Sequence, residues 1–153
     1  MSKYYLAYGS NLNTKQMKSR CPTAIAIGTG TIKDYRLLFK GSKTGSYLTI
    51  EQAKGFEVPV AVWKVEENDE RSLDIYEGYP SFYYKKEIDI DFVTIKSKKQ
   101  RHEKAFVYIM HEERKLGIPS QYYLGVCLEG YLRFGFDAKI LETALIKSLR
   151  EAK

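Results

Sequence analysis

Residues suited to metal binding and nucleophilic catalysis are scarce in this sequence. It contains two cysteines and two histidines among 153 residues. His102 and His111 have no second histidine or cysteine at a metal-ligand spacing, so no metal site is predicted. Cys21 and Cys127 are too few for the disulfide framework of a small secreted domain. We therefore expect both thiols to be reduced and Cys127 to lie in the core.

Long apolar runs and phosphate-binding glycine patterns are absent as well. No run reaches the ~18 apolar residues of a membrane span, and the N-terminus shows no signal-peptide pattern. A cytoplasmic protein without a membrane partner is therefore the expectation. The Gly28–Gly30 segment lacks the third glycine and the following helix of a dinucleotide site, and no phosphate loop occurs. We expect no nucleotide or other organic cofactor.

A single globular domain covering residues 1–153 fits the length and the composition, which is 44% apolar and 29% charged. The net charge is +6, and much of the excess lies in residues 96–104. A basic run between two predicted strands is more typical of a solvated hairpin loop than of a nucleic-acid surface. Nucleic acid is therefore not an expected partner.

Segments rich in β-branched and aromatic residues predict about six strands. In one of them Ile88, Ile90 and Phe92 alternate with acidic residues, which is the period-2 pattern of a half-buried strand. The predicted strands are residues 3–7, 24–39, 46–52, 58–65, 82–92 and 104–110.

Helical periodicity predicts helices at residues 13–20, 67–75 and 120–134, and one more from Asp137 to the C-terminus. Pro119 and Gly135 mark the two ends of the third helix, and Asp137 caps the fourth. The strands are not each followed by a long helix, which excludes a parallel doubly wound sheet. The predicted class is α+β, a small mixed β-barrel or strongly curled sheet with flanking helices.

Two segments together suggest a binding site. The first, Tyr8-Gly9-Ser10-Asn11-Leu12, follows a short apolar strand and runs into a helix, so its backbone N–H groups are free to hold a carboxylate or an oxyanion. The second, Leu73–Pro80, places Glu77 among tyrosines before a Gly-Tyr-Pro bend. Ser10 has no Gly-x-Ser-x-Gly elbow and no histidine placed to activate it, which favours a turn or cap role over that of a nucleophile.

A series of short motifs follows a common order along nearly the whole chain. They are Tyr8–Leu12, Met17, Arg20–Pro22, Tyr35–Leu37, Val62–Trp63, Leu73–Asp74, Glu77–Pro80, Tyr84, Pro119–Ser120, Tyr123 and Gly130. In these motifs and their spacing the chain resembles the γ-glutamylcyclotransferase family, including its butirosin-type and plant avirulence-induced members.

The resemblance implies a small β-barrel with flanking helices and the cyclisation of a γ-glutamyl group to 5-oxoproline, with release of the attached amine. It implies no metal or organic cofactor. Glu77 corresponds to the family's catalytic acid/base, and Tyr8–Leu12 to the loop that binds the glutamyl end. Tyr84 and Tyr123 correspond to pocket tyrosines. The loop after Gly-Ser differs from that of the glutathione-degrading branch, so glutathione is not the implied substrate.

Glu77 suits this reaction because the substrate's own α-amine is the nucleophile. An α-ammonium has a pKa near ~8, so a positioned base has to remove its proton. An ordinary glutamate with a pKa near ~4.3 would accept that proton uphill by roughly 5 kcal/mol. We therefore predict that burial among rings such as Tyr76 and Tyr79 raises the pKa of Glu77. The same carboxylic acid can then protonate the leaving nitrogen.

Each of these roles has a structural alternative. Glu77 could be an exposed residue at a helix end, and Tyr8, Tyr84 and Tyr123 could be packing residues with satisfied hydroxyls. Asn11 is either a loop-fixing side chain or a cap. The protein could also be a non-catalytic module that binds a γ-glutamyl compound or a carboxylate in the same pocket. The leaving amine and the oligomeric state, a homodimer included, are left open.

Overall fold

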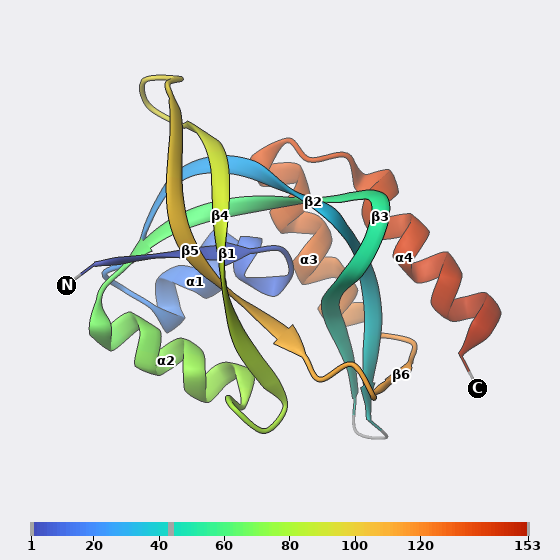
Figure 1. The fold of residues 1–153 in the computed structure, drawn as a ribbon. Helices are drawn as coiled ribbons and strands as arrows, with labels where there is room; N and C mark the ends of the chain where they lie inside the picture. Colours follow the sequence, from blue (N-terminus) through green and yellow to red (C-terminus); the bar gives the residue numbers. More distant parts are fainter. Residues whose placement is uncertain (1, 43–44, 153) are drawn as a thin grey trace.

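The structure is a computed structural model that describes residues 2–42 and 45–152. In this part of the chain, five strands close into a barrel (Figure 1). They are β1 (Lys3–Ala7), β2 (Ile25–Ser42), β3 (Gly45–Val65), β4 (Tyr83–Thr94) and β5 (Gln100–Met110). The order is β3-β1-β5-β4-β2, and β2 pairs with β3 to close the ring. The β1–β5 pair is parallel and the other barrel pairs are antiparallel, so the predicted mixed barrel is confirmed.

Alternating side chains fill the barrel as the sequence pattern predicts. Along β4, Ile90 and Phe92 are buried whereas Glu87, Asp89 and Asp91 are exposed. The same core takes in most of β5 and the second half of β3. Along β4, burial of one face fixes the register, because a slip of one residue would turn that face toward water.

The strands predicted at residues 46–52 and 58–65 form one continuous strand, β3. Its pairing with β2 shifts register beside Asp34, so that Lys33 pairs with Glu57 but Tyr35 pairs with Gln52. Asp34 has a φ of 63°, and its carboxylate accepts a hydrogen bond from the Gly55 N–H at 3.0 Å. Residues 53–57, of which 54–57 are exposed, form this bulged bend, although their sequence looks like a break between two strands.

Helices fill most of the remaining chain, at positions close to those predicted. The described elements are the 3₁₀ turn η1 (Ser10–Leu12), α1 (Thr14–Arg20), α2 (Glu67–Glu77), α3 (Gln121–Phe134), α4 (Ala138–Glu151) and the short strand β6 (Lys115–Leu116), which pairs with β2. Asn13, Ser120 and Asp137 cap α1, α3 and α4 through their side chains. Helix α2 continues two residues beyond its predicted end, as far as Glu77.

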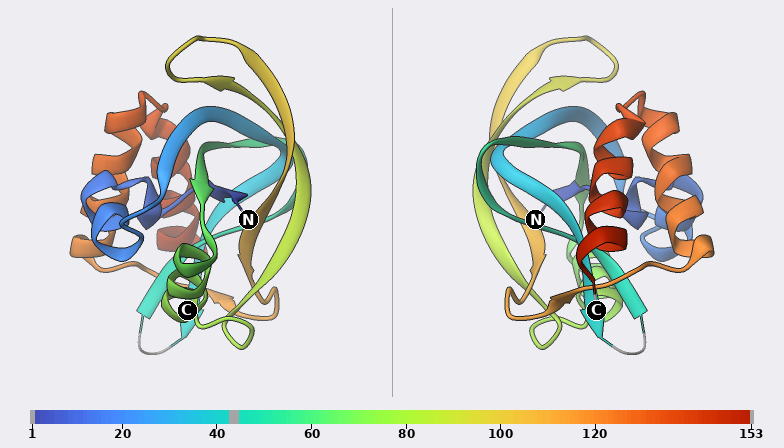
Figure 2. Two further views of the ribbon diagram at one scale, coloured as in Figure 1. Left: turned by 90° about the vertical axis from the view of Figure 1, so that its left-hand side faces the viewer. Right: turned by 90° about the vertical axis from the view of Figure 1, so that its right-hand side faces the viewer.

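The helices lie outside the barrel in two places. Helices α3 and α4 pack together on one side, where α4 lies against β2 and α3 covers η1 (Figures 1 and 2). Helix α2 lies apart from them, beneath the opposite part of the barrel. Among the described residues, no helix is long and apolar enough to cross a membrane. Cys127 is buried as predicted; Cys21 is buried too, and neither forms a disulfide.

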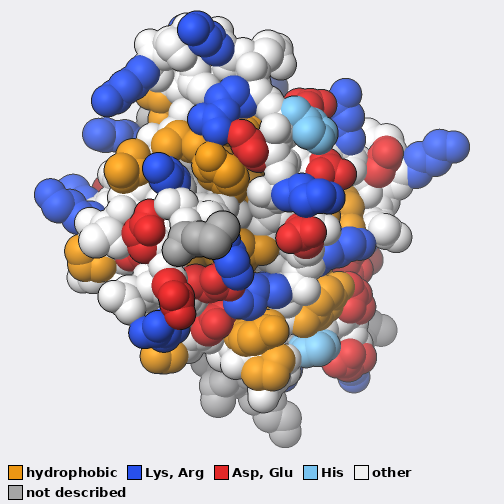
Figure 3. Space-filling view, turned by 60° about the vertical axis from the view of Figure 1, so that its left-hand side comes forward, with side chains coloured by type: hydrophobic (Ala, Val, Ile, Leu, Met, Phe, Trp, Pro, Cys, Tyr) orange, Lys and Arg blue, Asp and Glu red, His pale blue; other side chains and the backbone are white. Residues whose placement is uncertain are grey.

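The basic run 96–104 forms the projecting turn between β4 and β5 and the start of β5, as predicted for a hairpin. Basic side chains prevail at this end of the molecule, and the two charge signs are intermixed below it (Figure 3). Arg101 pairs with Glu103 at 2.5 Å, and His102 with Asp91 at 2.6 Å. Such pairs neutralise part of the positive charge, which agrees with a solvated hairpin.

Close backbone contact holds α3 against η1. A Cβ at Gly130 would lie 2.5 Å from the Leu12 Cβ and 2.9 Å from the Asn13 nitrogen, so only glycine fits there. Gly125, on the same helix, has no neighbour within 4 Å of its would-be Cβ. The two glycines therefore form a matched pair for substitution.

We predict that Gly130→Ala destabilises the protein by about 1–3 kcal/mol, because the added methyl group forces α3 and η1 apart. Gly125→Ala should instead stabilise it by about 0.5–1 kcal/mol, since alanine loses less backbone entropy in a helix. Urea unfolding of both variants tests this. Equal midpoints for Gly130→Ala and the parent would contradict the close packing.

Candidate active site

A cavity of about 380 Å³ opens where the ends of several elements meet. It is bordered by β1 and the segment after it, by η1, and by parts of β3, α2, β4, β5 and α3. The lining residues are Tyr5, Tyr8, Gly9, Ser10, Asn11, Tyr47, Leu48, Ile75, Tyr76, Glu77, Gly78, Phe82, Tyr83, Tyr108 and Tyr123. The two segments singled out in the sequence, 8–12 and 73–80, thus meet at one site.

The loop after β1 borders this cavity and contains backbone N–H groups without a backbone partner. In the described part of the chain, no backbone hydrogen bond is donated by the N–H groups of Gly9, Ser10 or Asn11. The carbonyl groups of Gly9 and Ser10 accept from Leu12 and Asn13, both at 3.0 Å, which turns the chain into η1. These three N–H groups therefore have no backbone partner among the described residues.

Side chains hold this loop in place from two sides. The Asn11 amide donates to the Tyr5 hydroxyl at 2.9 Å, and its carbonyl oxygen accepts from the Arg20 guanidinium. The Ser10 and Tyr76 hydroxyls are hydrogen-bonded at 2.8 Å. Of its two predicted roles, Asn11 has the loop-fixing one, and capping of α1 falls to Asn13.

Glu77 is the last residue of α2 and lies partly exposed in the cavity wall. Gly78 ends the helix in the left-handed conformation, with a φ of 63°. Burial raises the pKa of the Glu77 carboxyl to about 8, and the nearby Arg20 guanidinium acts in the opposite direction. The pKa is therefore raised, as predicted. Arg20 stacks on the Tyr76 ring at 3.4 Å, whereas Tyr79 is not among the lining residues.

Several tyrosine hydroxyls around the cavity are bound to the backbone. The Tyr8 hydroxyl donates to the Tyr108 carbonyl and the Tyr83 hydroxyl to the Leu48 carbonyl, each at 2.7 Å. The Tyr123 hydroxyl accepts from the Leu48 N–H at 3.0 Å. It also lies 3.3 Å from the position of a Cβ at Gly9. Burial raises the pKa of Tyr8, Tyr83 and Tyr123, so these phenols are neutral at physiological pH.

Two of the predicted binding residues do not line the cavity. Leu12 is fully buried, against Gly130. The Tyr84 hydroxyl bonds to Glu112 and its ring lies against His111, whereas the adjacent Tyr83 faces the cavity. Neighbouring residues of a strand point to opposite faces, and the sequence did not show which tyrosine faces inward. Contact of Tyr84 with a ligand stays a prediction that the cavity lining does not support.

Sequence reasoning missed part of the cavity wall. Outside the two predicted segments and Tyr123, six further residues line the cavity: Tyr5, Tyr47, Leu48, Phe82, Tyr83 and Tyr108. Tyr5, Tyr83 and Tyr108 lie in predicted strands, but an inward-facing tyrosine there has the same sequence pattern as a core residue.

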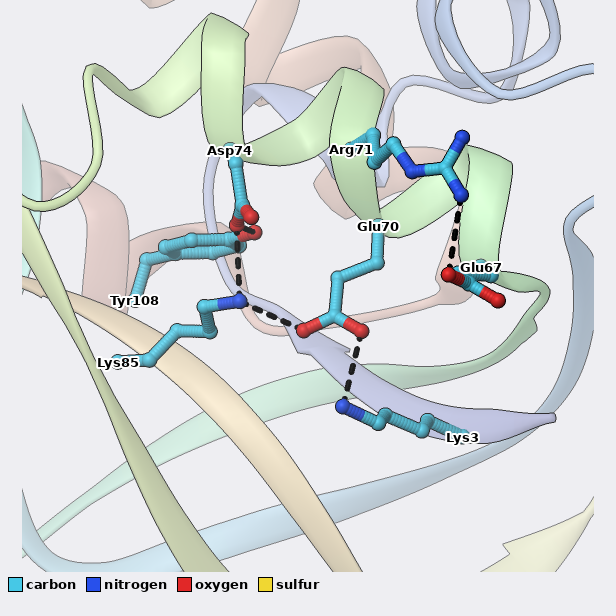
Figure 4. Close-up of polar contacts among 7 residues, drawn as sticks. All are labelled: Lys3, Glu67, Glu70, Arg71, Asp74, Lys85 and Tyr108. Carbon is cyan, nitrogen blue, oxygen red and sulfur yellow. Dashed lines mark hydrogen bonds and ion pairs between the residues drawn. The ribbon is translucent and has the colours of Figure 1, made fainter. Parts of the chain in front are cut away.

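Beside the cavity, a polar cluster joins α2 to three strands (Figure 4). Lys85 of β4 lies 2.6 Å from Glu70 and 2.9 Å from Asp74, both on α2. Glu70 also pairs with Lys3 of β1 at 3.0 Å, and Asp74 accepts a hydrogen bond from the Tyr108 hydroxyl of β5 at 2.5 Å. We refer to these five residues as the α2 cluster.

Donors suited to a metal do not gather at the cavity. Within residues 2–42 and 45–152, no three His, Cys, Asp or Glu side chains lie together as a metal site requires. Glu77 is the one carboxylate among the described lining residues.

Comparison with known proteins assigns the chain to a family. Residues 5–125 match the family model described as gamma-glutamyl cyclotransferase, AIG2-like. A gamma-glutamylcyclotransferase from Bos taurus is 31% identical over 131 residues, covering 81% of this chain and 68% of the bovine protein. One from Homo sapiens is 39% identical over 87 residues, covering 52% of this chain and only 46% of the human protein.

Solved structures agree with this assignment. A structure described as a gamma-glutamyl cyclotransferase superposes with a TM-score of 0.77 at 28% identity, covering 94% of this chain and 86% of the other. An uncharacterized protein from Homo sapiens superposes with a TM-score of 0.75 at 29% identity, with the same two coverages. With most of its length matched in both sequence and fold, the chain belongs to the gamma-glutamyl cyclotransferase, AIG2-like family.

Proposed function

We propose that this protein is an enzyme that cyclises the γ-glutamyl group of a γ-glutamyl amine or γ-glutamyl amino acid to 5-oxoproline and releases the amine. Family membership supports the reaction class. The observation that carries the assignment is Glu77, the one carboxyl group among the described lining residues, with its pKa raised to about 8.

The raised pKa matches Glu77 to its proposed task. The α-ammonium of a γ-glutamyl compound also has a pKa near ~8, so proton transfer to this carboxylate is nearly balanced in free energy. A carboxyl with an ordinary pKa would be several units too weak a base. The largest influence on this pKa is desolvation, which comes from the position of Glu77 in the cavity wall.

The proposed reaction needs no nucleophile from the protein. The Glu77 carboxylate takes a proton from the substrate's α-ammonium, and the neutral amine attacks the γ-carbonyl carbon to form a five-membered ring. The carbonyl oxygen becomes an oxyanion as the new C–N bond forms. Glu77 then returns its proton to the leaving nitrogen and the old C–N bond breaks. The regenerated carboxylate takes the second proton from the ring nitrogen and passes it to the released amine, so 5-oxoproline and an ammonium result. One carboxyl group thus serves as both base and acid.

The free N–H groups of Gly9, Ser10 and Asn11 are the proposed anion-binding part of the site. They are available either for the substrate's α-carboxylate or for the oxyanion. Since Asn11 and Ser10 are tied to Tyr5 and Tyr76, these donors are held in place before substrate binds. We propose the small γ-glutamyl substrate as the partner of this site. Cytoplasmic residence stays a prediction, and the oligomeric state stays open.

Replacing the carboxyl of Glu77 tests the proposed base. Glu77→Gln keeps the size of the side chain but cannot accept the proton, so formation of 5-oxoproline should fall by about 10²–10⁴-fold. The measurement is 5-oxoproline release from a panel of γ-glutamyl amino acids, γ-glutamyl-ε-lysine and other γ-glutamyl amines. Glu67→Gln, at the exposed start of the same helix, is the matched control and should retain activity.

The two possible failures of this experiment differ in meaning. Full activity of Glu77→Gln would remove Glu77 from the mechanism while leaving the reaction class intact. Ligand-induced thermal stabilisation of the parent protein without any product would instead support the non-catalytic binding module.

We further predict a pH dependence set by Glu77. Its carboxyl has to be ionised in the free enzyme to act as a base, so kcat/KM should decline tenfold per pH unit as the pH falls below about 8. Initial rates measured at constant ionic strength from about pH 4 to about pH 9 would show this decline. A decline of kcat/KM that begins only near pH ~4.5 would mean that the carboxyl titrates like an ordinary glutamate.

A further inference from the structure

We propose that Lys85 and Asp74 are positioning residues, which hold the end of helix α2 so that the Glu77 carboxylate stays in the cavity wall. This inference rests on the proposed function of Glu77, but it concerns residues outside the reacting groups. Its evidence is the geometry of the α2 cluster.

Helix α2 has few apolar anchors. Among its residues only Asp69 and Leu73 are buried, and Ile75, two residues before Glu77, is 83% exposed. Asp69 belongs to the first turn, where it accepts hydrogen bonds from the Glu66 N–H and the Thr23 hydroxyl. The last turn of the helix therefore depends on other contacts for its position.

Tyr76 provides one of those contacts, through its hydrogen bond to Ser10 and the stacking of Arg20 on its ring, and the α2 cluster provides the others. Glu70 and Asp74 are one helical turn apart and Glu77 follows three residues later, so all three lie on neighbouring positions of one helix face. Lys85 binds both Glu70 and Asp74 from β4, and Figure 4 shows its ammonium group between the two carboxylates. The side chains of Lys85 and Glu70 are only 19% and 14% exposed, so solvent screens this pair less than a surface ion pair.

The cluster is also connected to the cavity. Asp74 accepts the hydrogen bond of Tyr108, whose ring lines the cavity and whose carbonyl accepts from Tyr8. The Lys85 ammonium lies 5.8 Å from the Tyr108 ring and 4.4 Å from the Tyr79 ring. Asp74 thus joins one wall of the cavity to the helix turn that carries Glu77.

Charge balance explains why Lys85 is required. The cluster contains two ammonium groups, Lys3 and Lys85, and two carboxylates, Glu70 and Asp74. Without Lys85 the Asp74 carboxylate loses its cation and faces Glu70 directly, and the two carboxylates repel each other. The last turn of α2 should then move away from β4 and β5. A displacement of about 1 Å at a reacting group can lower a rate about 10²-fold.

The first test compares three variants in the 5-oxoproline assay. Lys85→Met keeps most of the aliphatic chain but removes the charge, and it should lower kcat about 10–100-fold with KM changed less than about threefold. Lys85→Arg should restore much of the loss, because a guanidinium can also bridge two carboxylates. Lys86→Met is the control: its parent lysine, next on β4, binds the Tyr35 hydroxyl, and its activity should not change.

A second test does not need turnover. The pKa of Glu77, measured by NMR with ¹³C-labelled glutamate, should fall in Lys85→Met because the displaced carboxyl is better solvated. Loss of a nearby positive charge alone would raise that pKa, so the direction of the change separates positioning from a purely electrostatic effect. Lys85→Gln removes the same charge and should lower the Glu77 pKa in the same way, and it serves as the second variant if Lys85→Met does not fold.

The outcomes also separate this inference from the proposed function. An active parent whose Lys85→Met variant keeps kcat, or a Glu77 pKa that is unchanged or raised in Lys85→Met, overturns the positioning role. Absence of product from the parent protein argues against the proposed reaction, while the NMR titration still decides whether Lys85 positions Glu77.

Discussion

The closure of the barrel by β3 is the constraint on which the rest of the structure depends. This strand pairs with β1 along one edge and with β2 along the other, so the sheet has no free edge there. Its residue Leu48 is fully enclosed, and the backbone N–H and carbonyl of Leu48 bind the hydroxyls of Tyr123 and Tyr83. The backbone of Leu48 thereby holds two tyrosines of the cavity lining, Tyr83 and Tyr123, in place.

The candidate site has two parts that are held differently: the segment 8–12 by hydrogen bonds and close packing, and the end of α2 largely by ion pairs. The segment 8–12 is held by hydrogen bonds to Tyr5 and Tyr76 and by the close approach of Gly130. Glu77 lies at the end of a helix that the α2 cluster ties to the barrel. Desolvation raises its pKa, and Arg20 limits the increase. The pKa of the proposed base thus depends on the position of the last turn of α2, which carries Glu77.

Much of the fold could be predicted from local patterns. The alternation around Ile90 and Phe92 correctly indicated a strand, and the signals at Pro119, Gly135 and Asp137 correctly placed α3 and α4. The break predicted between residues 52 and 58 was wrong, because a bulge opposite Asp34 exposes these residues without ending the strand. A local pattern reports exposure, and it does not distinguish a bulged strand from a loop.

By itself, the sequence determined the chemical types in the site and the elements that carry them: a glycine-containing turn after a strand, and a glutamate at a helix end. Only the tertiary structure decided which residues surround that glutamate. Tyr83 rather than Tyr84 faces the cavity, and Tyr108 and Lys85 approach α2 from strands that follow it in the chain. Desolvation and ion pairing depend on distances across the fold, and these distances arise only when the barrel closes.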